Sequence, residues 1–268
     1  MKTVITAIAA LILINACTEI ITEPVTDTAV VEAYLTPGET ASVKLSRLIR
    51  FTEDGFTDST YIDSAAVYVG FNGTDYLLTP VDTAPGSYVC SDSNLVILPE
   101  KSYKLSFIHD GISITSETTV PKKPQNLHLS EIYYHWDPDG ILEGYLDPLY
   151  VYWDNTDDSY YQIVVEYMDA TYSPINEFMD PNNYDSFRKT SSNPINTDTY
   201  VLAPRRQLPF WGNYRLIIYK VNMEYVDLYD SMSQSSISIT EPPSNIDNGL
   251  GIFTGINSDT IMFKLIRI

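Results

Sequence analysis

The feature that most constrains this chain is the alternation of apolar and polar residues, whose period of two is typical of half-buried β-strands. The alternation is clear at residues 65–71, and Asn72-Gly73 directly after them is the strongest short hairpin signal in the sequence. Asp110-Gly111 is a second two-residue hairpin turn. Further strands are expected at residues 30–35, 41–48, 75–78, 87–90, 95–98, 103–108 and 112–119. Strands at about ten-residue spacing, without a helical period, favour an all-β fold.

Residues 120–124 (VPKKP) end this series of strands, because two closely spaced prolines cannot continue a hydrogen-bonded ladder. We therefore predict an immunoglobulin-like β-sandwich at residues 26–121 and a β-rich C-terminal domain at residues 122–268. In the second domain, strands are expected at 127–134, 149–153, 160–167, 199–202, 213–221 and 260–268. One short helix is expected at 223–236, where apolar residues recur at three and four. Residues 169–194, rich in Asn, Asp, Ser and Pro, are typical of a long insertion that is functional or mobile.

The first seventeen residues have the pattern of an export signal. Lys2 is followed by an apolar run of about ten residues, roughly half of what a membrane-spanning helix requires. The ending INAC at residues 14–17 resembles the bacterial lipobox, after which the leader is removed and the cysteine receives fatty acyl groups such as palmitate. We expect a signal peptide at residues 1–16, lipidation of Cys17 and a tether at residues 17–25, because two or three acyl chains anchor a protein stably. The alternatives are an ordinary secretory leader cut at the same point and a small amphipathic helix.

The composition is that of an acidic chain with enough apolar residues for a sizeable core. The net charge is −19, and hydrophobic residues make up 44% of the 268 residues. That length is enough for one large or two ordinary domains after the leader. Binding of nucleic-acid phosphates needs clustered Lys and Arg, so we expect no nucleic-acid partner. An anionic membrane surface is disfavoured as a partner for the same reason.

The sequence carries no recognisable catalytic or metal-binding constellation. If Cys17 is lipidated, Cys90 has no disulfide partner, and we favour a buried small hydrophobe over a reactive thiol at that position. The three histidines, His109, His128 and His135, lack the spacing of a zinc or nucleophilic site. A serine nucleophile motif and a phosphate loop are also absent. We therefore expect no enzymatic activity, no cofactor and no metal.

Two acidic loops are candidates for calcium binding. Residues 137–140 (DPDG) begin like a calcium loop but lack the later acidic ligands at the required spacing. Residues 154–158 (DNTDD) are the second candidate. Ordinary turn chemistry is the favoured explanation for both, because Asp and Asn are frequent turn formers.

Tyrosine is over-represented, with 21 residues against 9 phenylalanines. Many of the tyrosines lie in residues 133–184, together with Trp136 and Trp153. Such aromatic side chains can form a platform for a glycan, a peptide or a protein partner, but tyrosine is also a good residue for half-buried strands. The candidate contacts for a ligand or partner in the long insertion are Tyr172, Phe178, Tyr184 and Phe187.

A tripeptide of Asp, then Ser or Thr, then an aliphatic residue, Met or Thr, recurs along the chain. It resembles the acceptor tripeptide of a general O-glycosylation system for exported proteins in Gram-negative bacteria. Pairs of Asp with Ser or Thr are also common in turns, which is the rival explanation. The candidate acceptors are Thr28, Ser59, Ser64, Thr83, Ser231 and Thr260.

Residues 243–253 (PSNIDNGLGIF) resemble the C-terminal signature of the outer-membrane lipoprotein family catalogued as domain of unknown function 4249. The early strands VVE at 30–32 and VKLS at 43–46 fit the layout of that family, as does Tyr160-Tyr161 behind an aspartate-rich turn. The resemblance implies a two-part, β-rich lipoprotein, whose gene often lies beside that of a TonB-dependent outer-membrane receptor. It implies no catalytic residue. The Gly and Asn residues of the C-terminal stretch supply positive φ, so we favour a structural role over a ligand-binding loop.

These observations combine into one expectation. We expect a non-enzymatic lipoprotein anchored in the outer membrane, on its periplasmic or its surface face, that acts as an accessory or binding partner of a TonB-dependent receptor. The alternative is an independent glycan- or peptide-binding module that uses its aromatic-rich C-terminal loops.

Overall fold

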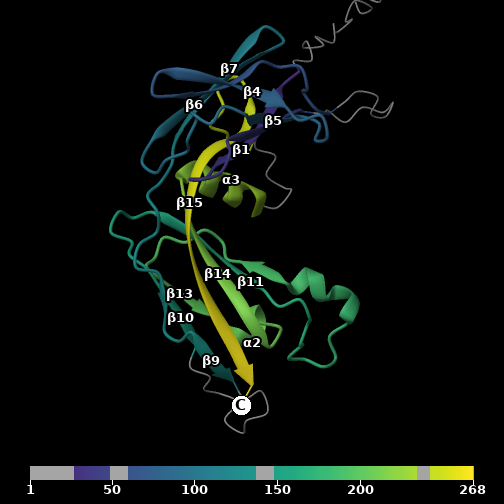
Figure 1. The fold of residues 1–268 in the computed structure, drawn as a ribbon, viewed down its shortest axis with the longest axis vertical. Coiled ribbons are helices and arrows are strands. Elements are labelled where there is room, and N and C mark those ends of the chain that lie inside the picture. The colour runs from purple at the N-terminus through teal and green to yellow at the C-terminus, as the bar shows by residue number, and fades with distance from the viewer. Residues whose placement is uncertain (1–26, 49–59, 137–147, 234–241, 268) are drawn as a thin grey trace, which may run out of the picture.

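The structure is a computed structural model of the chain, and it describes residues 27–48, 60–136, 148–233 and 242–267. These residues form two lobes that follow one another along the long axis of the molecule (Figure 1). The last strand, β15 (Leu250–Arg267), runs through both lobes. The fold is all-β, as the period-two pattern predicts.

The first lobe contains seven strands besides the beginning of β15. They are β1 (Ala29–Leu35), β2 (Ser42–Arg47), β3 (Val67–Phe71), β4 (Thr74–Pro80), β5 (Ser87–Cys90), β6 (Ser102–His109) and β7 (Ile112–Thr119). Their order in the sheet is β1-β2-β5-β4-β3-β6-β7. An immunoglobulin domain of the constant type places its first, second, fifth and fourth strands in one sheet, and its third, sixth and seventh in the other. The first lobe has this order, with β4 also paired to β3, so the predicted immunoglobulin-like sandwich is confirmed.

Both predicted hairpin turns are present. Asn72 and Gly73 have φ of 51° and 79°, and they join β3 to β4. Asp110 and Gly111 have φ of 48° and 76°, and they join β6 to β7. Positive φ at both central residues is the property of the turn that matches the twist of the flanking strands. The residues of the two turns therefore account for the pairing of β3 with β4 and of β6 with β7.

The expected strand at residues 95–98 is wrong, and Tyr103 supplies the reason. Leu95 and Ile97 are buried in the core, as their alternation indicates, but the segment pairs with no strand in the part of the chain that the structure describes. The Tyr103 hydroxyl donates to the Val96 carbonyl at 2.7 Å and accepts from the Leu98 amide at 2.7 Å. A side chain thus takes the place of a neighbouring strand. A tyrosine near the start of the sixth strand that bonds back to the upstream backbone is the tyrosine corner of immunoglobulin-like domains.

The beginning of β15 completes the first lobe. It pairs in parallel with β1, from Val30 opposite Leu250 to Leu35 opposite Gly255. On its other side, the Thr118 hydroxyl of β7 accepts from the Gly255 amide. The chain therefore returns from its C-terminal part to lie between the first and last strands of the sandwich. The pairing covers the edge of β1, which would otherwise expose unpaired backbone groups.

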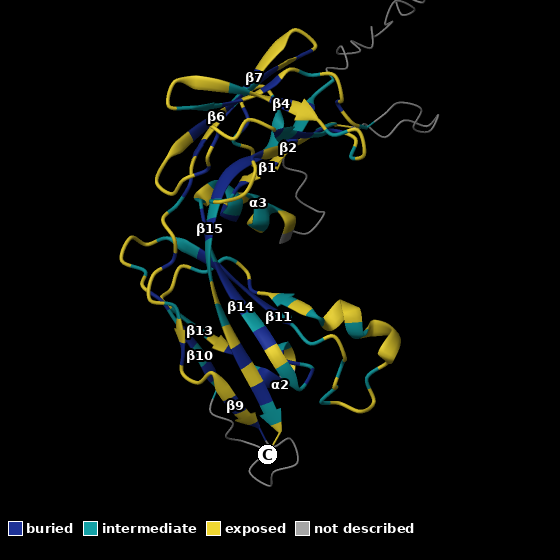
Figure 2. Cartoon of the chain, viewed as in Figure 1, coloured by how far each residue is buried: buried dark blue, intermediate teal, exposed yellow. Residues whose placement is uncertain are grey.

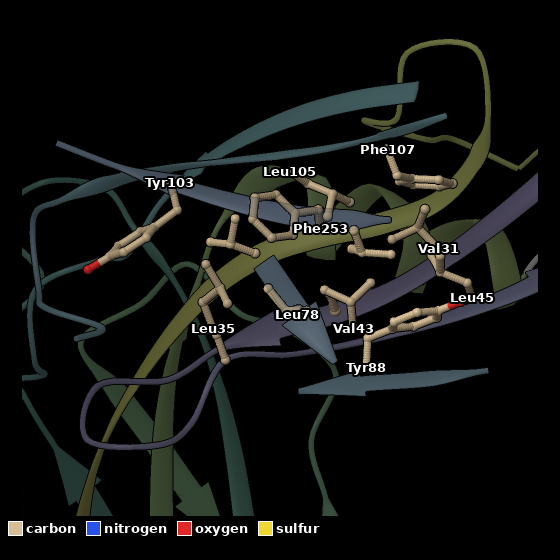
Figure 3. Close-up of a cluster of buried hydrophobic side chains, with 14 of the residues drawn as sticks. Val31, Leu35, Val43, Leu45, Leu78, Tyr88, Tyr103, Leu105, Phe107 and Phe253 are labelled. Carbon is tan, nitrogen blue, oxygen red and sulfur yellow. The ribbon is translucent and has the colours of Figure 1, made fainter. Parts of the chain in front are cut away.

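The core of the first lobe includes a side chain from β15. Figure 3 shows Phe253 between Leu105 and Phe107 on one side and Val31 and Val43 on the other. Phe253 is completely buried, and it belongs to the same hydrophobic cluster as these four residues. The predicted boundary after residue 121 lies between two cores, but residues from the C-terminal stretch contribute to the first of them.

The second lobe consists of two packed sheets and short helices. Its other strands are β8 (His128–Leu129), β9 (Tyr133–Trp136), β10 (Leu149–Tyr152), β11 (Tyr160–Tyr167), β12 (Lys189–Ser191), β13 (Thr199–Leu202) and β14 (Gly212–Val221). The larger sheet has the order β12-β11-β14-β15, with β9 paired to the end of β15, and the smaller has the order β13-β10-β8. Apolar residues of both sheets form one core. Buried and exposed residues alternate along the lower part of β15 (Figure 2).

The predicted helix is α3 (Met223–Ser233), which lies where the two lobes meet (Figure 1). One oxygen of its Glu224 accepts hydrogen bonds from the hydroxyls of Thr118 in β7 and Thr254 in β15, at 3.0 Å and 2.8 Å. A single carboxylate thus ties α3 to both neighbouring strands. Within the described residues, the structure adds two short helical segments to the prediction, a 3₁₀ helix at Pro181–Phe187 (η2) and one helical turn at Pro204–Gln207 (α2).

Candidate functional site

A hollow lies on the face of the sheet where β15 passes from the first lobe to the second. One part, of about 530 Å³, is lined by residues of β1, β2, β14 and β15. A second part, of about 340 Å³, continues over β11 and β12 and against α3. Tyr34, Tyr219 and Ile256 line both parts. We call the two parts together the inter-lobe groove, with Tyr225 of α3 in its wall.

Strand register brings these side chains together. Tyr34 lies opposite Thr254 of β15, and two residues further along β15 lies Ile256, opposite Val221 of β14. Because side chains two apart share a face of a sheet, the ring of Tyr34 and the side chain of Ile256 emerge on the same side. Tyr219, two residues before Val221, follows on this face. The groove is therefore a property of the shared strand rather than of either lobe.

Tyr34, Tyr219 and Tyr225 form the aromatic surface of the groove. The Tyr34 ring lies edge-on to the Tyr225 ring with 6.4 Å between centroids, and the Tyr225 hydroxyl donates to the Gln162 side-chain oxygen at 2.8 Å. Burial raises the pKa of Tyr34, Tyr219 and Tyr225 above the usual value for tyrosine. These hydroxyls are therefore neutral hydrogen-bonding groups at physiological pH.

Charged side chains of both signs border the aromatic part. Glu32, Glu39 and Lys44 line the end of the groove that belongs to the first lobe. Lys189 and Ser191 line the end that belongs to the second lobe. The first part of the groove is lined mostly by polar residues, whereas the second part combines its tyrosines with the apolar Val164, Val221 and Ile256. The arrangement can stack a sugar ring or an apolar side chain against tyrosine and donate or accept hydrogen bonds around it.

The four predicted contact residues of the long insertion do not form one surface. Tyr172 and Tyr184 pack against the second core, where their ring centroids lie 4.9 Å and 5.5 Å from that of the buried Phe210. The Tyr172 hydroxyl also donates to Asp185, and this bond is the main cause that raises the pKa of Tyr172. Phe178 is 96% exposed and Phe187 is 48% exposed. The two tyrosines therefore anchor the insertion, and the two phenylalanines face solvent.

The aspartate-rich turn at residues 154–158 is tied to the second lobe by a lysine. The Lys220 ammonium group donates to Asp157 at 2.6 Å, and it lies 5.6 Å from the centroid of the Tyr161 ring. The hydrogen bond from Lys220 is the main cause that lowers the pKa of Asp157. A hydrogen bond of 2.9 Å from the Ser159 amide to the side-chain oxygen of Asn155 closes the turn. These contacts favour the turn interpretation. Residues 137–140, the other calcium candidate, lie outside the described residues.

The cysteine, histidine and tryptophan residues considered in the sequence analysis do not lie together in the structure. Cys90 is buried, and no disulfide involves it within the part of the chain that the structure describes. His128 and His135 are exposed in the second lobe, whereas His109 is buried in the first. Trp136 and Trp153 are both buried in the second core. They are therefore not available as a surface platform.

The acceptor tripeptides differ in accessibility. Ser64, Thr83 and Thr260 are exposed, and Thr28 and Ser231 are half-buried. The Ser231 hydroxyl donates to the Leu228 carbonyl at 2.7 Å within α3. Ser59 and the candidate lipidation residue Cys17 lie outside the described residues.

The amino-acid sequence matches a protein family described as a domain of unknown function, DUF4249, over residues 18–261. The chain belongs to this family. The match begins directly after Cys17 and includes β1, α3 and most of β15, so both lobes are part of the DUF4249 region. No curated protein matches the chain.

Solved structures of tandem β-domains show a weak similarity to this DUF4249 chain. The FN1–FN3 domains of chicken CNTN1 match 88% of this chain and 67% of their own length, with 9% identity and a TM-score of 0.28. A set of domains from titin matches 89% of this chain and 67% of its own length, with 10% identity and a TM-score of 0.21. These scores are too low to carry an argument. The assignment of the first lobe rests instead on its strand order and on Tyr103.

The sequence did not point to the inter-lobe groove. Tyr34 alternates with the buried Ala33 and Leu35, so the pattern places its ring on the outer face of β1. Nothing local, however, indicates that Tyr219 and Tyr225 lie on the same face. Of the described helices, none is long and apolar enough to span a membrane.

Proposed function

We propose that this DUF4249 protein is a non-enzymatic, lipid-anchored binding module of the outer membrane, and that it serves as an accessory partner of a TonB-dependent receptor. The observation that carries the proposal is the inter-lobe groove, which draws its residues from both lobes along one continuous strand. A strand shared by two cores fixes the lobes relative to one another in this part of the chain. A preformed groove on such a scaffold loses little conformational entropy when a partner binds.

Two further observations support the anchored binding role. The lipobox-like INAC at residues 14–17 directly precedes the first residue of the DUF4249 match. The groove offers tyrosines, which are enriched in the buried centres of protein interfaces. Its rim carries Glu32, Glu39, Lys44 and Lys189, which can select a partner by charge.

Site-specific crosslinking in intact membranes tests this proposal. A photo-crosslinking phenylalanine analogue replaces Tyr34 in one variant and Tyr133 in a matched control. Tyr34 lies in the groove, whereas Tyr133 is 59% exposed on β9 in the second lobe. We expect a TonB-dependent receptor to be captured from position 34 and not from position 133. Recovery of no receptor from position 34, or equal recovery from both positions, contradicts the proposal.

A second candidate is the independent binding of a glycan or a peptide. The observation that favours it is the cluster of Tyr34, Tyr219 and Tyr225, whose hydroxyls are neutral and of which Tyr225 donates to Gln162. Titration of the purified protein with a glycan and peptide panel by calorimetry tests it. Binding that is lost in Tyr34→Ala and kept in Tyr133→Ala supports this second function. Binding by both variants alike places the ligand outside the groove.

A further inference from the structure

Three potential metal ligands meet at one end of the first lobe, away from the inter-lobe groove. His109 ends β6, Asp110 begins the turn to β7, and Asp27 lies two residues before β1. One ligand atom from each residue lies within 4.8 Å of the other two. The sequence separates Asp27 from the other two residues by most of the first lobe, so only the fold of the sandwich brings them together.

The buried histidine is the informative member of this cluster. Its side chain is 8% exposed, and among the described residues its Nε2 atom has no hydrogen-bond partner. This nitrogen nevertheless lies 3.3 Å from Oδ2 of Asp27. A buried polar atom without a hydrogen bond is costly, and a bound ion or water is one way to satisfy it.

The distance between these two atoms is that expected for ligands of one zinc ion. Zinc bonds of about 2.0–2.2 Å to nitrogen and oxygen, at tetrahedral angles, separate two ligand atoms by roughly 3.4 Å. The carboxylate of Asp110 is exposed, so it can rotate to become the third ligand. Imidazole nitrogen with carboxylate oxygens is a donor set that favours a divalent transition metal over calcium or magnesium.

Arg47 competes for the same site. Its guanidinium group lies 2.8 Å from Oδ2 of Asp27, the oxygen that faces His109. The Arg47 side chain is 40% exposed, so it can move into solvent when a cation takes its place. Arg47 therefore lowers the affinity of the site without closing it.

We propose that Asp27, His109 and Asp110 form a binding site for a divalent transition metal such as Zn²⁺, with Arg47 as a built-in competitor. The site lies at the start of β1, directly after the expected tether at residues 17–25. Metal binding would clamp the segment before β1 to the β6–β7 turn. This fixes the point at which the anchored end of the chain joins the sandwich.

Calorimetric titration of the full chain in detergent, stripped of metal with a chelator, tests the proposal with ZnCl₂ and, separately, CaCl₂. We expect one Zn²⁺ per chain. His109→Gln and Asp27→Asn should each weaken Zn²⁺ binding at least about tenfold, since even a group that only orients a ligand costs about 10–100-fold. Arg47→Gln should strengthen Zn²⁺ binding several-fold. This gain cannot come from misfolding. The control His128→Gln, an exposed histidine of the second lobe, should change nothing.

Three results overturn the proposal. They are absence of stoichiometric Zn²⁺ binding, unchanged affinity in a folded His109→Gln variant, and equal binding of Ca²⁺ and Zn²⁺. Weaker Zn²⁺ binding by Arg47→Gln also contradicts it, because that result would make Arg47 a support of the site. Circular dichroism of each variant shows whether it is folded.

Discussion

The side chain of Asn245 forms both hydrogen bonds of a β-bridge with the backbone of Phe253. Its amide nitrogen donates to the Phe253 carbonyl at 2.7 Å, and its oxygen accepts from the Phe253 amide at 3.0 Å. The backbone carbonyl of Asn245 in turn accepts from the Ser116 hydroxyl of β7. One asparagine thus positions the beginning of β15 between the strands of the first lobe, with the Phe253 ring in the core. This gives the C-terminal stretch a structural role.

Phe253→Ala should lower the free energy of unfolding by about 3–5 kcal/mol, because a fully buried aromatic ring is lost. Asn245→Ala should lower it by about 1–3 kcal/mol, since two backbone groups lose their partner. Chemical denaturation measures both, and Phe187→Ala, half-exposed on the insertion, should stay within about 0.5 kcal/mol of the parent. Unchanged stability of Phe253→Ala would show that β15 does not hold the first lobe together.

Gly251 and Gly38 provide a matched pair of positions with positive φ. The φ angles are +101° and +82°, but an added Cβ at Gly251 would lie 1.9 Å from the Val31 carbonyl oxygen, whereas at Gly38 it meets no atom of the described residues within 4 Å. Gly38→Ala should therefore cost only about 1 kcal/mol of backbone strain. Gly251→Ala should cost several times more, because β1 and β15 must separate. Thermal melting of the two variants compares them, and equal melting temperatures would contradict the close approach of the strands.

Two aspartates predict how stability depends on pH. The hydrogen bond from Lys220 lowers the pKa of Asp157, and bonds from the Asn213 side chain and backbone lower that of Asp169. A carboxyl with a lowered folded pKa stabilises the fold above its unfolded pKa, and this contribution is lost as pH falls through the folded pKa. Stability should therefore hold at neutral pH and decline below about pH 4.

Denaturation measured across this pH range tests the assignment to the two aspartates. Asp169→Asn should reduce the free energy of unfolding more at pH 7 than at pH 3, so that stability declines less steeply as the pH falls. Asp157→Asn should do the same, at a cost of about 1–3 kcal/mol at pH 7 because the buried Lys220 loses its partner. Asp227→Asn, an exposed carboxylate of α3, is the control. If Asp169→Asn and Asp157→Asn leave the decline of stability at acidic pH unchanged, the pH dependence comes from other groups.

Cys17→Ala should release the protein from the membrane fraction, because Cys17 is the expected site of acylation and two or three acyl chains anchor stably. Cys90→Ala is the matched control, since Cys90 is buried in the first lobe and should not affect attachment. Fractionation of cells together with metabolic labelling by a palmitate analogue measures both. A Cys17→Ala variant that stays membrane-bound would exclude a lipid anchor at this residue.

The sequence alone determined the local architecture. Asn72-Gly73 and Asp110-Gly111 adopt positive φ at low cost wherever they occur, so their hairpins could be predicted without knowledge of the rest of the chain. The strand at residues 160–167 and the start of α3 at Met223 follow from periodicity in the same way.

Only the tertiary structure decided which distant segments meet. The local pattern predicts a closing strand at residues 260–268, whereas β15 begins at Leu250, because pairing with β1 extends it. The Thr115 hydroxyl and Asp247 form a hydrogen bond across 132 residues of sequence, and no local pattern encodes such a contact. The inter-lobe groove depends on the same long-range pairing. The positive φ of a turn depends on the residue that adopts it, so sequence alone predicts it. The shared strand β15 depends on both lobes, because each buries apolar side chains against it.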